Sequence, residues 1–382
     1  MTVFSRTDTS LLSNWWWTVD RWLLMTLVTL IGVGIVMTFG ASPAIAEKLG
    51  LPSFHFVKRQ LFFLFLAMII MFGVSLLSTK WVRRLGVIMF LGCFILLVLT
   101  MVVGMEAKGA RRWLPMGSYT LQASEFLKPA FIIFSAWMFS EVQKTPGFRG
   151  WSIAIFSYLL VVALLISQPD FGQTILISLV WAAQFFMAGL PMVWVLGLVG
   201  LGMAGMFFAY ILVPHVTSRI DRFLFPESGD TFQIDTALNA FRSGGLFGRG
   251  PGEGVVKKIL PDAHTDFIFA ATGEEFGILI CLFLICVFAA IVIRSLLRVM
   301  KETDLFIFLA VSGLIIQFGL QAFINLGVNL SILPSKGMTL PFISYGGSSV
   351  VAVAIAMGMV LALTRRGVRD NLEVLNLARR RS

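Results

Sequence analysis

Basic side chains with the chemistry to hold phosphate lie around the start of one apolar run. Arg111 and Arg112 precede Trp113, and Glu125 and Lys128 follow at the beginning of that run. A guanidinium group makes paired hydrogen bonds to phosphate oxygens, so arginines beside a membrane surface suit a diphosphate head group. A general anchor at the membrane interface would use the same residues. This loop is therefore a candidate binding site whose chemistry stays open.

Acidic side chains open another long apolar stretch. Asp266 ends the polar segment 260–266, directly after His264 and Thr265, and Glu274 and Glu275 follow two turns deeper. Ionised groups are costly inside a bilayer unless they face water or a partner, so these carboxylates are candidates for function. Asp266 could instead cap the helix, and the two glutamates could pair with a basic residue inside the bundle. His264 could orient Asp266 or have no role.

A third segment combines a lysine with irregular backbone. Residues 331–345 contain Pro334, Lys336, Gly337 and Pro341 between two apolar runs. Backbone that is neither helix nor strand is tolerated at membrane depth only where protein covers it or where it lines a wet cavity. The pattern predicts a re-entrant segment that lines a site. Lys336 could bind an anionic ligand there, or extend to the lipid head groups.

The composition requires membrane helices to position these residues. Hydrophobic residues make up 58% of the 382, charged residues 13%, and the mean hydropathy is +0.89, which excludes a water-soluble fold. A span needs about 20 apolar residues. We predict an all-α, polytopic membrane protein of about ten transmembrane helices, located near Leu23–Gly40, Leu61–Leu77, Leu85–Gly104, Phe126–Phe139, Ile153–Ser167, Thr174–Ala188, Val193–Val213, Phe267–Ile293, Phe306–Leu330 and Ser348–Leu363.

The charge distribution predicts how the chain is organised across the membrane. Lys and Arg are concentrated in the segments on the side of the N-terminus, so both termini are expected in the cytoplasm. The predicted parts are a cytoplasmic segment 1–21, a transmembrane domain 22–364 and a basic tail 365–382. Within the domain, residues 214–265 form a long extracytoplasmic loop between the seventh and eighth helices, typical of a functional loop. Attraction to anionic membrane lipids explains the basic tail, and no nucleic-acid binding is expected.

The motifs resemble the SEDS family of proteins for shape, elongation, division and sporulation. The similarity extends from the first apolar run to the last and is carried by Arg-Trp-Leu at 112–114 and His-Thr-Asp-Phe at 264–267. The segment 334–341, Pro-Ser-Lys-Gly-Met-Thr-Leu-Pro, is similar to the cell-division branch rather than to the elongation branch. Two departures lie nearby, because Asp262 replaces a commoner Glu and Lys258 stands where some relatives have an acidic residue.

The resemblance implies a function and partners. It implies a peptidoglycan glycosyltransferase of the bacterial cytoplasmic membrane that joins lipid II units at the division septum, with undecaprenyl diphosphate as leaving group. It also implies a class B penicillin-binding transpeptidase and other division proteins as partners. Asp266 matches the family's essential aspartate, and Trp113 matches its loop tryptophan.

A mechanism follows as a hypothesis. Asp266 would be the general base, and Arg111, Arg112, Lys128 and Lys336 would stabilise the departing diphosphate, with Mg²⁺ as an optional helper and no assigned metal ligands. Two other functions stay open, a flippase that moves lipid II across the membrane and a non-catalytic scaffold for the transpeptidase. A flippase would need charged residues along both halves of its pathway, whereas the informative charges here cluster on the predicted outer side.

Overall fold

The architecture is a bundle of long helices, described by a computed structural model over residues 10–107, 110–117, 119–189, 192–212, 216–218, 220–221, 225, 232–334 and 337–365. Each predicted span coincides with a helix, so the sequence prediction of a polytopic all-α protein is confirmed. In chain order these helices are α2 (Arg21–Lys48), α3 (His55–Ser75), α4 (Thr79–Val103), α5 (Ala123–Lys144), α6 (Gly150–Ser167), α7 (Phe171–Met187), α8 (Met192–Leu212), α11 (Ile268–Val299), α12 (Leu305–Asn329) and α13 (Gly347–Leu363).

The helices differ in how apolar they are. Six of them, namely α2, α3, α4, α6, α11 and α12, are long and apolar enough to cross a membrane by length and composition alone. α5 is less apolar because it carries Glu125, Lys128, Glu141 and Lys144, yet most of its side chains are buried. It packs against α4, α6, α12 and α13, so it lies in the interior of the bundle.

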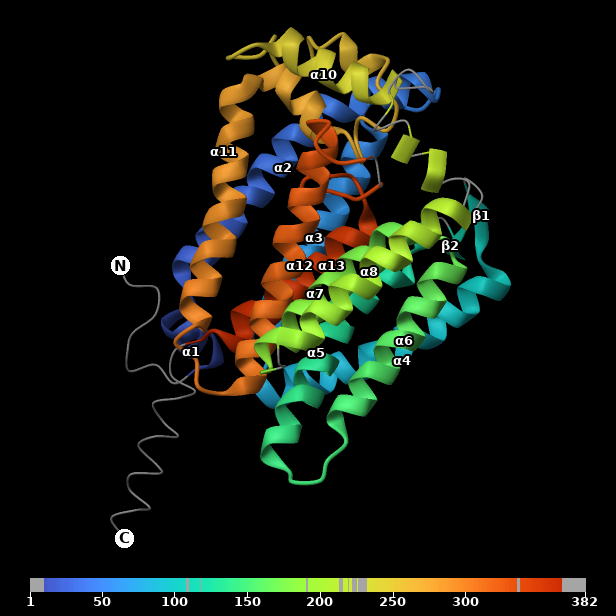
Figure 1. Cartoon of the computed structure of the whole chain (residues 1–382). Helices are drawn as coiled ribbons and strands as arrows, with labels where there is room; N and C mark the ends of the chain where they lie inside the picture. Colours follow the sequence, from blue (N-terminus) through green and yellow to red (C-terminus); the bar gives the residue numbers. More distant parts are fainter. Residues whose placement is uncertain are drawn as a thin grey trace.

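Two of the loops contain regular structure that the sequence analysis did not predict. The loop before α5 forms an antiparallel sheet of three strands in the order β1 (Met105–Ala107), β2 (Ala110–Met116) and β3 (Tyr119–Leu121). The long loop contains the helix α10 (Phe232–Gly244) and a short 3-10 turn, Val256–Lys258. α10 buries Thr236, Ala237, Ala240 and Gly244 on one face, which packs on α11. Figure 1 shows α10 at one end of the bundle and the short helix α1 (Leu11–Thr18) at the other.

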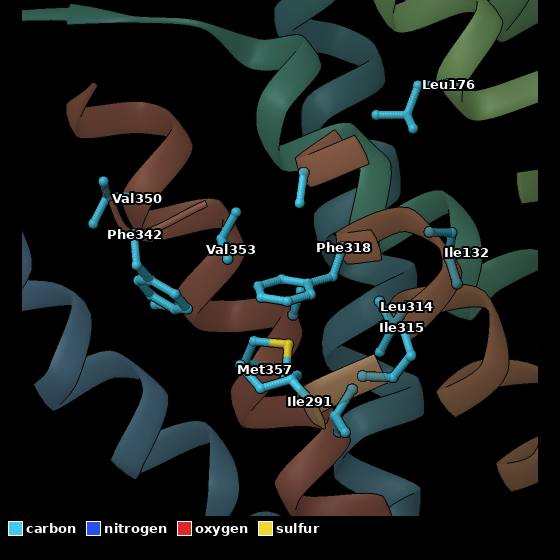
Figure 2. Close-up of a cluster of buried hydrophobic side chains, with 14 of the residues drawn as sticks. Ile132, Leu176, Ile291, Leu314, Ile315, Phe318, Phe342, Val350, Val353 and Met357 are labelled. Atoms are coloured by element: carbon cyan, nitrogen blue, oxygen red, sulfur yellow. The ribbon is translucent and has the colours of Figure 1, made fainter. Parts of the chain in front are cut away.

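The core joins α12 to its neighbours. Figure 2 shows the ring of Phe318 on α12 directed toward α13, where Val353 and Met357 lie. These side chains are nearly inaccessible to solvent, as are Leu314 and Ile315 one turn earlier on α12. Close packing on several sides fixes α12 as a rigid element. Any polar residue on the same helix is therefore held at a defined position.

α11 is interrupted where α10 and its following loop meet it. Gly277 has φ 82° and ψ 174°, which breaks the helical hydrogen bonding inside the element. The loop after α10 supplies the missing partners, because the Gly250 amide donates to the Glu275 carbonyl and the Ile278 amide donates to the Gly245 carbonyl. A Cβ on Gly277 would lie 2.3 Å from the Leu246 carbonyl oxygen, so only glycine fits the contact.

Candidate active site

Asp266 lies in a short loop that is bound at three successive carbonyl groups. The His264 carbonyl accepts a hydrogen bond from the Tyr345 amide (2.9 Å), and the Thr265 carbonyl accepts one from the Ser344 hydroxyl (2.6 Å). The Asp266 carbonyl accepts two, from the side-chain amides of Asn325 and Asn329 on α12, both at 2.9 Å. The Asp266 side chain is half-buried. Its backbone is thus held while its carboxylate is partly accessible.

Asp266 does not occupy the N-cap position of α11, which was the alternative role for it. Phe267 occupies the N-cap position of α11, so Asp266 precedes the cap residue by one. Its carboxylate lies against the re-entrant segment, since a Cβ built on Gly337 would be 3.5 Å from its Oδ2. The carboxylate therefore faces the re-entrant segment, residues 331–345.

His264 is enclosed by aromatic rings. Its ring centroid lies 4.8 Å from that of Phe56 on α3 and 5.4 Å from that of Tyr345. Burial lowers the pKa of His264 to about 4, against the opposing effect of the Asp262 charge. Its Nδ1 atom has no hydrogen-bond partner in the described part of the chain. A neutral ring packed in this way helps to shape the loop that carries Asp266.

The re-entrant segment is fixed from both sides. Gln60 on α3 donates to the Ser344 carbonyl (3.1 Å) and accepts from the Gly346 amide (3.4 Å). Gln321 on α12 donates to the carbonyl and hydroxyl oxygens of Thr339, at 3.1 and 3.3 Å. Ser335 and Lys336, the predicted anion-binding lysine, lie outside the described residues.

Lys128 and Glu125 form a buried ion pair on α5 rather than an exposed one. Lys128 Nζ lies 2.9 Å from Glu125 Oε2 and 3.0 Å from Gln321 Oε1, and the Lys128 side chain is 1% exposed. Gln173 on α7 donates to the other Glu125 oxygen at 2.6 Å. A charged pair with further hydrogen bonds can persist in a low-dielectric interior. Through Gln321 it is connected to Thr339 of the re-entrant segment.

The two arginines of β2 have different surroundings. Arg112 is half-buried, and its guanidinium group donates to the carbonyls of Gln168 and Pro169 and lies 3.8 Å from Asp170 Oδ1. Arg111 is 54% exposed and is within 3.6 Å of Glu106. Trp113, half-buried on the same strand, is opposite Met105. Arg111 is thus more accessible than Arg112.

Glu274 and Glu275 hold the loop after α10 against α11. Glu274 is fully buried and accepts hydrogen bonds from the amides of Val255, Val256 and Lys257, at 2.6, 2.7 and 2.7 Å. Glu275 pairs with the Lys257 ammonium group, which also donates to the Gly40 carbonyl on α2 at 3.0 Å. Sequence analysis allowed such a pairing but did not name Lys257. Both glutamates here support the structure around the site.

Among the predicted site residues that the structure describes, some are brought together. Asp266, His264 and the re-entrant segment are in contact, and Lys128 and Glu125 reach that segment through Gln321. Sequence reasoning missed the polar residues within apolar helices, namely Gln60, Gln173, Gln321, Asn325 and Asn329. The spacing of Gln321, Asn325 and Asn329 by four residues was a usable signal, because it places them on one helix face. Among the described residues, no three His, Cys, Asp or Glu side chains cluster as a metal site would require.

The chain is similar to known proteins over nearly its whole length. Residues 21–367 match the family FTSW_RODA_SPOVE, described as cell cycle protein. The chain is 47% identical over 364 residues to the probable peptidoglycan glycosyltransferase FtsW of Caulobacter vibrioides, covering 95% of this chain and 93% of that protein. It is 34% identical over 355 residues to the protein of the same name from Geobacter metallireducens, covering 91% and 95%.

Solved structures show the same fold. A chain of a peptidoglycan synthase complex, described as coordinating polymerization and crosslinking, matches with a TM-score of 0.75 and 26% identity, covering 91% of this chain and 97% of that chain. The rod shape determining protein RodA of Thermus thermophilus matches with a TM-score of 0.68 and 26% identity over the same shares. From its sequence and its fold alike, the chain belongs to the FtsW, RodA and SpoVE family of cell cycle proteins, the SEDS family.

Proposed function

We propose that the protein is a peptidoglycan glycosyltransferase that polymerises lipid II into glycan strands during bacterial cell division. The observation that carries the proposal is the Asp266 carboxylate, which is partly accessible, on a loop bound at three successive carbonyls and beside Gly337. Relatives that share up to 47% of the sequence are named probable peptidoglycan glycosyltransferases. The undecaprenyl diphosphate of the donor is the leaving group.

The proposed reaction is a nucleophilic displacement at a sugar. Asp266 accepts the proton of the acceptor sugar's 4-hydroxyl as that oxygen attacks the anomeric carbon of the donor, and the bond from that carbon to the diphosphate breaks. For this role the Asp266 carboxylate must lie within hydrogen-bond distance of that hydroxyl. No step is assigned to Mg²⁺. Because both substrates are anchored by lipid tails, the bilayer limits their orientations and raises their effective concentration.

Basic residues are proposed to bind the diphosphate, and they differ in how accessible they are to a substrate. Arg111 is 54% exposed and needs only to leave an exposed contact with Glu106, which is a weak interaction. Lys128 and Arg112 would have to exchange buried partners for substrate oxygens. Arg111 is therefore the first candidate for direct contact, with Trp113 on the same strand beside it.

The proposal includes an orientation and a partner. The end of the bundle that carries α10 and Asp266 faces away from the cytoplasm, because Lys and Arg favour the opposite side. A class B penicillin-binding transpeptidase is the proposed partner, in line with the similarity to a chain of a peptidoglycan synthase complex. The two proteins would act together at the division septum.

The decisive experiment is polymerisation of purified lipid II by the purified protein together with its transpeptidase. Native protein is compared with Asp266→Asn, which removes the carboxylate and keeps the shape, and we expect a loss of at least about 100-fold in rate. Asp262→Asn is the matched control, because it makes the same change four residues earlier in the same loop. We expect that control to retain most of the activity.

Each outcome separates the candidate functions. Polymer from the native protein and the control, but not from Asp266→Asn, supports the glycosyltransferase with Asp266 as base. Equal amounts of polymer from all three proteins would mean that a residue other than Asp266 is the general base. If none of the three forms polymer, two further assays distinguish the other functions. Transport of lipid II across liposome membranes would support the flippase. Crosslinking by the partner that is unchanged although no polymer forms would support the scaffold.

A further inference from the structure

Asn325 on α12 contacts both segments of the site with a single side-chain amide. Its Nδ2 atom donates to the Asp266 carbonyl at 2.9 Å and to the Met338 carbonyl at 2.6 Å. The Asn325 side chain is buried, and α12 is packed on several sides. The amide therefore ties the loop of Asp266 and the re-entrant segment to one rigid helix.

Asn329, one turn further along α12, strengthens the same contact. Its Nδ2 donates to the Asp266 carbonyl at 2.9 Å and to the Asn325 carbonyl, and its Oδ1 accepts from the Ala270 amide at 3.1 Å. The Asp266 carbonyl thus receives two donors from one helix face. A carbonyl with two amide donors has little freedom to move. The start of α11 is held at the same point.

The geometry points to Asn325 as a positioning residue for the reaction, which sets the distance between the Asp266 carboxylate and the re-entrant segment. This inference rests on the proposed function of Asp266. Met338 directly follows Gly337, and Gly337 is the residue beside the Asp266 carboxylate. One amide hence fixes both sides of that contact. A misplacement of about 1 Å in a catalytic group can cost about 100-fold in rate.

The test compares two buried amides that make the same kind of bond. Asn325→Leu removes the two bonds to the Asp266 and Met338 carbonyls. Gln184→Met on α7 removes two bonds of 3.1 Å to the carbonyls of Ile132 and Leu309, away from Asp266. Both side chains are buried, so both variants should lower the unfolding temperature by similar amounts. For Asn325→Leu we expect kcat to fall about 30- to 100-fold with KM within about threefold, whereas Gln184→Met keeps both values within about threefold.

A second variant keeps the inference testable if Asn325→Leu does not fold. Asn325→Gln retains the amide donors but places them one methylene group further from α12, so Asp266 shifts while the bonds persist. The expected result is a lower kcat at an unfolding temperature no lower than that of Gln184→Met, because the added methylene group at a buried position also costs stability. An undiminished kcat in Asn325→Gln, or equal kcat values for Asn325→Leu and Gln184→Met, would overturn the inference.

Asp266→Asn measured alongside separates two kinds of failure. If Asp266→Asn is as active as the native protein, the proposed role of Asp266 is wrong. If Asp266→Asn is inactive while Asn325→Leu keeps its kcat, Asp266 is the base and only the positioning role of Asn325 is wrong.

Discussion

A neutral histidine in the loop that carries Asp266 makes the stability of the protein depend on pH. Because burial lowers the pKa of His264 from 6.5 to about 4, the unfolded chain binds a proton there at pH values where the folded chain does not. The stability of the native protein should therefore fall as the pH decreases from about 6.5 toward 4, by up to about 3 kcal/mol. His264→Gln cannot titrate and should lose less stability over this range, as measured by thermal unfolding in detergent at several pH values.

His55 provides the control for this prediction. It lies next to Phe56, at the start of α3, and its ring also contacts Phe56. His55→Gln makes the same substitution at a second histidine that contacts Phe56, so it serves as the comparison for His264→Gln. If His264→Gln and the native protein lose stability in parallel between pH 6.5 and 4, the depressed pKa of His264 is not the cause.

At the residue scale the sequence predicted the Asp266 carboxylate as a candidate for function, but it did not predict which residues hold the loop of Asp266. Asp266 was predictable because a charged group at the start of an apolar run is unusual. Gln60 is a single neutral amide, which a helix tolerates at modest cost, so nothing in its local sequence marked it as a site residue. Asn325 was marked only by its spacing of four residues from Gln321 and from Asn329. Their partners lie far away in the chain, since Gln60 binds the Ser344 carbonyl across 284 positions. A single sequence does not record such pairings.

At the scale of the elements, the loop after α10 is docked on α11 at a buried junction. Lys257 is 3% exposed and Glu275 is 1% exposed, so each neutralises the other in the interior. A Cβ on Gly40 would overlap the Glu275 carboxylate, so α2 is part of the same junction. Sequence analysis predicted residues 214–265 as a loop, but not that its second half is docked on a broken helix.

Loss of one partner in this junction should be costly. Lys257→Met leaves the Glu275 carboxylate buried without its cation, and we expect the free energy of unfolding to fall by about 3 kcal/mol. The double variant Lys257→Met/Glu275→Gln removes both charges and should recover part of that loss. Thermal unfolding measures the stability, and limited proteolysis between Gly245 and Val256 measures whether the loop is released. A double variant no more stable than Lys257→Met would argue against an electrostatic cause.

At the scale of the whole molecule, the spans were the most predictable feature. A membrane helix needs a length of apolar residues that is visible directly in the sequence, and each of the ten predicted segments overlaps a helix over most of its length. The ends of the helices were less predictable than the spans themselves. For example, α2 continues past Gly40 and Pro43 to Lys48. The sheet of β1, β2 and β3 was missed, since its strands have three to seven residues and no apolar alternation.

The proposed orientation can be tested with reactive cysteines. In a background where Cys93, Cys281 and Cys286 are replaced by serine, Glu253→Cys and Lys301→Cys place exposed thiols at opposite ends of the bundle. With α10 outside, a membrane-impermeant maleimide should label Glu253→Cys in cells whose outer membrane is opened. Lys301→Cys should react only after the cytoplasmic membrane is permeabilised. The reverse pattern would place Asp266 in the cytoplasm.

The interior position of α5 has a consequence for how the protein is made. Its side chains Glu125 and Lys128 are paired within one turn, so the helix itself supplies one partner for each of them. The remaining polarity is satisfied by Gln173 and Gln321, which are synthesised later. Both of these hydrogen-bond partners are thus absent until α7 and α12 have been synthesised. The buried pair on α5 therefore gains its full set of hydrogen bonds only when α12, the helix that also binds Thr339 of the re-entrant segment, is in place.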